Sequence, residues 1–294
     1  MLLKRIYGKL FAGKKMNNMV IDKTTMDAAE RHRSFDSMSG ILSWLISLAR
    51  SEFSNFSLKE KTVLEIGSGK FFTHALGLYL CGCNEVVSID KFRQLNPEAM
   101  KLAMSKVVLA RRFLSPHVTH DQFVERMNLL KQTHFELEEL DSLGIKYVAP
   151  FDLIESNDFE EDFDIILSYA VLEHVPPHET GLLLEKSLKT LKPGGYCIHF
   201  IDLEDHRYSE NDPFHFLASG QIWSDENCFT RGNRLRFSLW KLLFENCFTF
   251  DWHYPYVAVR NDAPLATEID KQIEYKNDQD LRTTAFVAVG RKAK

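Results

Sequence analysis

Two glycines and an aspartate are spaced as in a nucleotide-binding turn. Gly67 and Gly69 directly follow an apolar run at residues 63–66, and Asp90 follows a second apolar run at residues 85–89. Glycines at the end of a strand let the backbone bend sharply and approach a ligand, and the next helix offers free N–H groups there. An acidic side chain at the end of the second strand can accept hydrogen bonds from two ribose hydroxyls. The spacing therefore predicts a site for a nucleoside.

A second group of chemically capable side chains lies in residues 199–206, His-Phe-Ile-Asp-Leu-Glu-Asp-His. This segment ends a predicted strand, and ligands of open α/β sheets bind beyond the carboxyl ends of the strands. We predict that His206 is a general base for an un-ionised hydroxyl, since a neutral imidazole suits this task at neutral pH. Asp205 or Asp202 would fix its tautomer, and Asp202 would also bind the substrate. The alternatives are ligation of a divalent metal, which we do not predict, and a solvated turn.

Apolar strand-like runs alternate with amphipathic helical patterns along most of the chain, which predicts an α/β fold. The expected strands are residues 61–66, 85–89, 147–149, 164–168, 195–201, 247–252 and 283–289. The expected helices outside the long segment after the second strand are residues 36–56, 72–80, 180–191 and 234–246. We expect a doubly wound, mostly parallel seven-stranded sheet with helices on both faces and right-handed crossovers.

The segment between the second and third expected strands is longer than one crossover requires, and its pattern is helical. Asn96 and Pro97 form a capping pair that starts one helix, and Thr119 with Gln122 predicts a capping box for another. We therefore predict an inserted helical layer at about residues 97–143. It could be a lid over a substrate pocket, additional packing, or the surface of a homodimer.

Composition places the chain among globular proteins. Its 294 residues include 36 basic and 41 acidic side chains, for a net charge of −5, so no nucleic-acid partner is expected. No apolar run is long enough to span a bilayer. The five cysteines are too few for a disulfide framework, and we interpret them as reduced thiols of a cytoplasmic protein.

The first residues form a basic amphipathic segment. Residues 1–15 contain five lysines and arginines and no acid, with apolar residues at roughly helical spacing. We predict a basic leader at residues 1–35 and a single domain at residues 36–294. Residues 1–15 could make weak peripheral contact with an anionic membrane; the alternatives are a mobile leader or a helix docked on the domain.

Three ordered motifs resemble the class I methyltransferases that use S-adenosylmethionine. The run Glu65-x-Gly67-x-Gly69 is similar to motif I of that family, residues 164–175 (DIILSYAVLEHV) resemble its fourth strand and turn, and residues 191–195 (LKPGG) resemble the turn before its fifth strand. A dinucleotide-binding turn has a third small residue, where this chain has Phe72. The resemblance therefore favours S-adenosylmethionine as the cofactor over NAD.

The resemblance also implies roles for individual residues. Gly67 and Gly69 would lie under the methionyl group of the cofactor, and Glu65 would orient the loop or the amino group. The other implied contacts are Asp90 to the ribose, Asp152 to the adenine amino group, Ser168 and Tyr169 to the methionyl end, and His174 near the transferred methyl. Phe71 stands where the family usually has a small residue. That departure keeps a catalytically silent binding or scaffold protein as an alternative, with a nicotinamide oxidoreductase as another.

The downstream part has a narrower resemblance. Residues 199–206 and 233–238 resemble a subgroup of class I methyltransferases associated with bacterial surface-polysaccharide biosynthesis. This implies a small-molecule, sugar or glycan-linked acceptor, with methylation at oxygen. Arg234 and Arg236 would then bind a phosphate or carboxylate of the acceptor; as surface residues of a helix they would need no special role.

Overall fold

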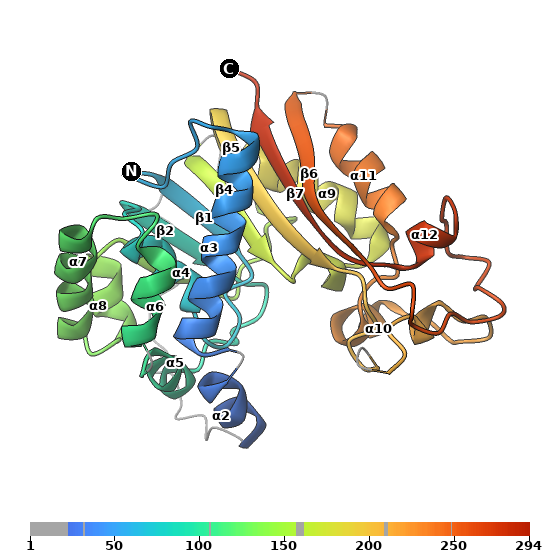
Figure 1. Ribbon diagram of the computed structural model, residues 1–294, viewed down its shortest axis with the longest axis horizontal. Coiled ribbons are helices and arrows are strands. Elements are labelled where there is room, and N and C mark those ends of the chain that lie inside the picture. The colour runs from blue at the N-terminus through green and yellow to red at the C-terminus, as the bar shows by residue number, and fades with distance from the viewer. Residues whose placement is uncertain (1–22, 32, 106, 157–161, 209–210, 248) are drawn as a thin grey trace. The chain divides into compact units, whose positions relative to one another are not determined.

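The computed structural model describes residues 23–31, 33–105, 107–156, 162–208, 211–247 and 249–294 (Figure 1). The predicted amphipathic segment at residues 1–15 lies outside this part of the chain. The seven strands are hydrogen-bonded in the order β3-β2-β1-β4-β5-β7-β6. The pairs β2–β3, β1–β4 and β4–β5 are parallel, while β7 runs antiparallel to both of its neighbours, β5 and β6, so that β6 has the same direction as β5. The predicted α/β fold with a mostly parallel seven-stranded sheet is confirmed. The chain forms two compact units, which are described separately.

The first unit contains the described residues up to Ser43, residues 58–62 and the described residues between 68 and 162. Its strands β2 (Glu85–Ile89) and β3 (Ile145–Val148) pair in parallel, with Val86 opposite Ile145. Helix α4 (Thr73–Leu80) is buried along its whole length. Helix α2 (Lys23–Glu30) packs against α5 (Pro97–Met104), so this part of the predicted leader is docked on the unit.

Four helices occupy the described residues between β2 and β3. They are α5, α6 (Val107–Leu114), α7 (His120–Gln132) and α8 (Leu137–Ser142). Asn96 caps α5 by accepting a hydrogen bond from the Ala99 N–H at 3.0 Å. Thr119 caps α7 by accepting from the Gln122 N–H, but the reciprocal half of the predicted box is replaced by a bond from the Thr119 hydroxyl to the Gln122 side chain. A lid function for these helices stays a prediction.

The second unit contains residues 44–57, 63–67 and 163–294. In it β1 (Thr62–Ile66) pairs in parallel with β4 (Phe163–Tyr169), and β4 with β5 (Leu191–Asp202). Strand β7 (Thr283–Lys292) runs antiparallel between β5 and β6 (Phe250–Val259). The helices are α9 (Pro177–Lys189), α10 (Asp225–Arg231), α11 (Phe237–Glu245) and α12 (Asp278–Leu281), with α9 against β5 and α11 against β6 (Figure 1).

Several predicted boundaries in this unit are wrong. Strand β5 begins at Leu191 and not at Gly195, so residues 191–195, expected as a turn, belong to the strand. The helix expected from Arg234 begins only at Phe237, because Arg234 has a positive φ of 64° that breaks a right-handed helix. The strand expected at residues 247–252 is β6, which continues to Val259 past Pro255. Proline is tolerated there because β6 is an edge strand, and the pairing register shifts at that point.

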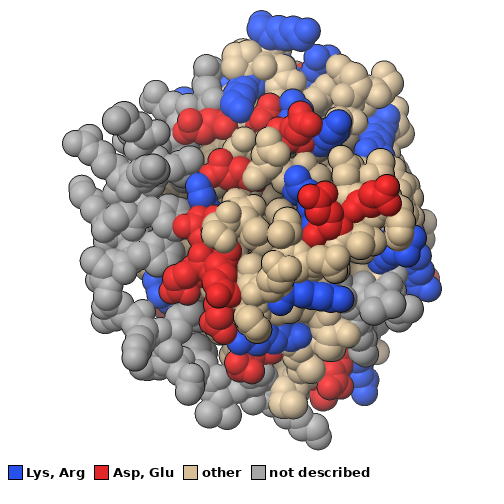
Figure 2. All heavy atoms as spheres, turned by 90° about the vertical axis from the view of Figure 1, so that its left-hand side faces the viewer, with Lys and Arg blue, Asp and Glu red and all other residues tan. Residues whose placement is uncertain are grey.

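The described surface carries side chains of both charges. On the face in Figure 2, the described acidic and basic side chains are interspersed and form no continuous basic patch. Lys101 on α5 forms an ion pair with Glu136, with Nζ and Oε1 2.7 Å apart. Among the described helices, none combines the length and the apolar composition needed to cross a bilayer.

Candidate active site

Asp90 connects the end of β2 to the glycine turn. Its side chain is 7% exposed, Oδ2 accepts the Gly69 N–H at 3.1 Å, and Oδ1 accepts the Phe92 N–H at 3.0 Å. A carboxylate oxygen can accept more than one hydrogen bond, so both oxygens keep capacity for a ligand hydroxyl. Asp90 can therefore hold the glycine turn in place and still serve as the predicted acceptor for a ribose.

A hydrogen bond between two serines also holds the glycine turn, residues 67–69, against β2. The Ser68 and Ser88 hydroxyls are 2.7 Å apart, and both side chains are buried. Gly69 has a φ of +60°, and a Cβ there would meet no atom within 4 Å. The glycine is thus needed for its backbone conformation, while the open space beside it leaves room for a ligand. The sequence analysis did not predict the Ser68–Ser88 contact.

Asp152 lies in the loop that follows β3. Its Oδ1 accepts the Ile154 N–H at 2.9 Å, and its Oδ2 is 2.9 Å from the Lys91 ammonium. Partial burial alone would raise the pKa of Asp152, but the bonds from Lys91 and Ile154 outweigh it and hold the pKa below its ordinary value. These contacts are those of a loop-tying carboxylate, and the implied contact with adenine stays a prediction.

In the second unit, Gly67 permits a close approach at the end of β1. Its φ is +86°, and a Cβ would lie 2.3 Å from Cγ2 of Val171. Val171 starts the turn η1 (Leu172–His174) that follows β4. Glu65, two residues earlier in β1, is 3% exposed. The glycine is therefore required both for backbone conformation and for packing of β1 on the turn after β4.

Ser168 and Tyr169 end β4 with different environments. The Ser168 hydroxyl is 2.8 Å from Nδ1 of His199, which is its register partner on β5, and both side chains are fully buried. Tyr169 points to the other face of the sheet, where its ring stacks on Phe200 at 4.7 Å. The Ser168 hydroxyl therefore has a protein partner, and the implied place of Ser168 at the methionyl end of the cofactor stays a prediction. The Tyr169 contact stays a prediction.

Burial keeps His199 neutral. Removal from solvent lowers its pKa from 6.5 to about 3, and the same cause, followed by the charge of Arg33, lowers the pKa of His74 to about 3. Because each folded-state pKa lies below the unfolded value, the unfolded chain binds more protons under mildly acidic conditions. The stabilisation is complete above pH 6.5 and is lost as the pH falls from there towards 3.

This difference predicts an acid-sensitive stability. Between pH 7.5 and 5.5, we expect the wild type to lose about 1.4 kcal/mol of unfolding free energy more than a His199→Gln variant. The measurement is urea unfolding at both pH values, with His178→Gln as the control because the His178 side chain is 66% exposed. Equal pH dependence of the wild type and His199→Gln would contradict the assignment of a neutral buried His199.

A polar cluster lies beyond the carboxyl ends of β4 and β5. The rings of His174, on η1, and His206, after β5, are 4.8 Å apart in an edge-to-face arrangement. Oδ2 of Asp202 is 3.7 Å from Nε2 of His206, and Nδ1 of His174 is 3.1 Å from the Cys228 carbonyl of α10. Burial and then the charge of His206 lower the pKa of His174, while burial raises the pKa of Asp202. The structure thus brings together three predicted site residues, His174, His206 and Asp202.

A comparison with protein families gives the chain its class. A family model described as a methyltransferase domain matches residues 42–250, which include the glycine turn, Asp90 and the cluster after β4 and β5. The chain belongs to this methyltransferase family. The predicted enzyme class and the predicted cofactor, S-adenosylmethionine, are confirmed.

The methyltransferase is also similar to solved structures, all distantly. PH0226 protein from Pyrococcus horikoshii is 13% identical with a TM-score of 0.47, and the match covers 95% of this chain and 100% of that one. YcgJ protein from Bacillus subtilis is 13% identical with a TM-score of 0.44, over 84% and 98%. An S-adenosylmethionine dependent methyltransferase from Mesorhizobium loti is 13% identical with a TM-score of 0.42, over 84% and 96%. No curated protein matches the chain significantly.

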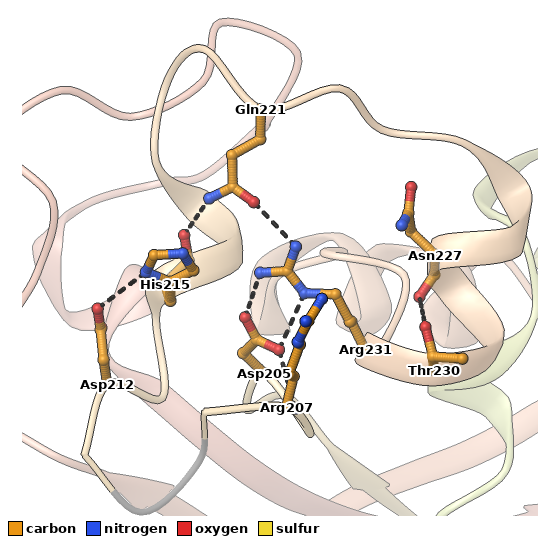
Figure 3. Close-up of polar contacts among 8 residues, drawn as sticks. All are labelled: Asp205, Arg207, Asp212, His215, Gln221, Asn227, Thr230 and Arg231. Carbon is orange, nitrogen blue, oxygen red and sulfur yellow. Dashed lines mark hydrogen bonds and ion pairs between the residues drawn. The ribbon is translucent and has the colours of Figure 1, made fainter.

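The predicted contact of Asp205 with His206 is wrong for this methyltransferase. Asp205 is fully buried, and its carboxylate accepts hydrogen bonds from the Arg231 guanidinium, at 3.1 Å from Nε and also from Nη2 (Figure 3). The Gln221 side chain accepts from the same guanidinium at 2.9 Å. Bidentate hydrogen bonds between a buried carboxylate and arginine are strong. Asp205 therefore fixes the loop after β5 to Arg231 of α10 and does not orient His206.

The two arginines expected at the surface of the methyltransferase are buried. Arg234 is 8% exposed and donates to Asp270 at 2.8 Å. Arg236 is fully buried and donates to the backbone carbonyls of Leu203, Leu281 and Thr283; burial lowers its pKa to about 10, so it stays charged at neutral pH. The predicted substrate contact of Arg236 is therefore wrong, because all of its side chain is enclosed by the protein.

Proposed function

We propose that the chain transfers a methyl group from S-adenosylmethionine to an oxygen of a small molecule or of a sugar or glycan-linked acceptor. The observation that carries this proposal is the cluster of His174, His206 and Asp202 beyond the carboxyl ends of β4 and β5. Oxygen acceptors need a group that helps their hydroxyl proton to leave, whereas neutral amines do not. The resemblance of residues 199–206 and 233–238 to the polysaccharide-associated subgroup supports a sugar-containing acceptor.

The chain's own residues would bind, align and shield the reactants. When bound, S-adenosylmethionine supplies a methyl group on a sulfonium, which an acceptor oxygen can displace in line. Asp90 would accept the ribose hydroxyls, and the backbone at Gly67 and Gly69 would lie along the methionyl group. No covalent intermediate on the protein is needed, so alignment and exclusion of water account for most of the catalytic task.

The setting proposed for the enzyme is the cytoplasm. All five cysteines are free thiols, and four of them are buried. Free buried cysteines are typical of proteins that work in a reducing compartment. This supports a cytoplasmic enzyme.

Binding of the donor tests the cofactor part of the proposal. We expect Asp90→Ala to weaken S-adenosylhomocysteine binding by about 1.5–3 kcal/mol, the range for a hydrogen bond to a charged group. Calorimetry measures this, with Asp121→Ala, an exposed acid on α7, as the matched control. An unchanged affinity of Asp90→Ala for S-adenosylhomocysteine would show that Asp90 does not bind the ribose.

Transfer to an acceptor tests the reaction itself. The purified protein is incubated with methyl-labelled S-adenosylmethionine and an extract rich in glycan precursors, and labelled products are analysed for O-methyl groups by mass spectrometry. Labelled O-methyl products support the proposal. Donor binding without any transfer favours the silent binding protein, and binding of a nicotinamide cofactor in place of the methyl donor favours the oxidoreductase.

A further inference from the structure

We propose that Glu173, His174 and His206 bind a divalent metal cation that accepts nitrogen ligands, such as Zn²⁺ or Mn²⁺. Each of the three side chains offers one ligand atom, and these atoms all lie within 4.8 Å of one another. Binding of the cation does not depend on the proposed function, but its use rests on it, since the cation would hold the oxygen of the acceptor.

The donor set is that of a metal site with free coordination positions. Two imidazole nitrogens and one carboxylate oxygen are ligands suited to Zn²⁺ and to Mn²⁺, and a site with three protein ligands leaves room for a water or a substrate. Ligand atoms of a tetrahedral zinc site lie about 3.4 Å apart, given bonds of about 2.1 Å. Small rotations of the side chains would bring the three atoms from their present separations to that spacing.

The orientation of His174 provides a second observation. Its Nδ1 lies 3.1 Å from the Cys228 carbonyl oxygen, an acceptor, so the hydrogen is assigned to Nδ1. The lone pair is then on Nε2, which can bind a cation. Histidines that bind metals usually donate their other ring N–H to a carbonyl or carboxylate in this way.

Helix α10 and a residue just after it hold the segments that carry the three ligands. Besides the Cys228 carbonyl, α10 supplies the Arg231 carbonyl, which accepts the His206 N–H at 3.3 Å. The Asn233 side chain, just after α10, donates to the Leu172 carbonyl at 3.3 Å and to the Val175 carbonyl at 2.9 Å, on both sides of Glu173 and His174. The ligands are therefore positioned before a cation arrives, which lowers the cost of binding it.

Charge also favours a cation at this position. Glu173 is 1% exposed, and Asp202 lies 3.7 Å from Nε2 of His206, so two carboxyl groups border the two imidazoles. Buried carboxylates are stabilised when they coordinate a metal. Asp202 can orient His206 or add a further oxygen ligand.

The metal changes the role of His206 in the proposed reaction. An imidazole whose lone pair binds a cation cannot also take a proton, so His206 acts as a ligand and not as the predicted general base. The cation binds the acceptor's hydroxyl oxygen and lowers its pKa, and the proton leaves to water. As the new carbon–oxygen bond forms, the methyl–sulfur bond breaks and its electron pair stays on sulfur, giving a neutral thioether.

Direct titration with metal tests the site independently of activity. The protein is treated with EDTA, dialysed, and titrated with ZnCl₂ and with MnCl₂ by calorimetry. We expect one equivalent of at least one ion to bind, and the affinity to fall at least tenfold in Glu173→Gln and in His206→Gln. His178→Gln is the matched control, as an exposed histidine at the start of α9. Calorimetry with S-adenosylhomocysteine verifies that each variant is folded.

Several outcomes would overturn the metal site. These are the lack of saturable binding of both ions, or binding by Glu173→Gln and His206→Gln with the affinity of the wild type. Methyl transfer that persists unchanged in EDTA would also overturn the role of the cation, while the proposed function would stand. Conversely, saturable metal binding by a protein that binds the donor but methylates no hydroxyl would leave the site in place and overturn the proposed function.

Discussion

Arg231→Ala is expected to lower the free energy of unfolding by about 3–5 kcal/mol, the usual cost of removing one partner of a buried ion pair. Asp205 has no exposed surface, and in the wild type its carboxylate accepts two hydrogen bonds from Arg231 (Figure 3). The alanine variant would leave this carboxylate buried beside a cavity. Urea unfolding monitored by circular dichroism measures the loss.

Two further variants distinguish loss of the Arg231–Asp205 ion pair from other effects of substitutions in this region. Arg207→Ala removes an exposed arginine two residues from Asp205 and is expected to change stability by less than about 0.5 kcal/mol. Arg231→Met combined with Asp205→Leu replaces both charges by apolar groups and is expected to recover most of the lost stability. A double variant as unstable as Arg231→Ala would show that the cost comes from packing rather than from an unpaired charge.

Gly67→Ala is expected to cost about 2–5 kcal/mol. About 1–2 kcal/mol comes from placing a Cβ in the left-handed region, since the φ of Gly67 is +86°. About 1–3 kcal/mol more comes from overpacking, because the new methyl group would lie 2.3 Å from the Val171 side chain. Thermal or urea unfolding measures the sum, and calorimetry is expected to show weaker donor binding as well.

The neighbouring glycine supplies the control for this prediction. Gly69→Ala meets the same left-handed strain, at a φ of +60°, but no atom lies within 4 Å of its Cβ, so only about 1–2 kcal/mol is expected. Adding Val171→Ala to Gly67→Ala is expected to restore the part that comes from the clash. Equal costs for Gly67→Ala and Gly69→Ala would show that contact with Val171 is unimportant.

The sequence predicted the sheet well because its central strands are short, apolar and bounded by turn residues. β2 matches its predicted bounds, and β1 and β4 differ from theirs by one or two residues. The errors fall where tertiary contacts override local pattern. The start of α11 was misplaced because the backbone of Arg234 is left-handed, and the length of β6 was underestimated because an edge strand can accommodate Pro255.

The site was predicted less completely than the fold, for a physical reason. Position along the chain indicates which residues follow a strand, and this placed Asp90, His174 and His206 correctly at strand ends. Position along the chain does not indicate which residue a side chain contacts after folding. Asp205 accepts hydrogen bonds from Arg231, 26 positions away, and Ser168 is hydrogen-bonded to His199 on the neighbouring strand. Glu173, adjacent to His174 in the fourth-strand turn, was overlooked although the motif itself contains it.

The reversed strand β7 has a consequence for how the protein is made. It follows β6 in the chain but lies between β5 and β6 in the sheet. During translation, β5 therefore has an open edge, and β6 has no partner, until the last of the seven strands has been synthesised. Much of β5 is buried in the folded protein. Until β7 pairs with it, the open edge of β5 can form hydrogen bonds with a strand of another chain. Nascent chains stalled before residue 283 are therefore expected to expose this edge and to aggregate through it.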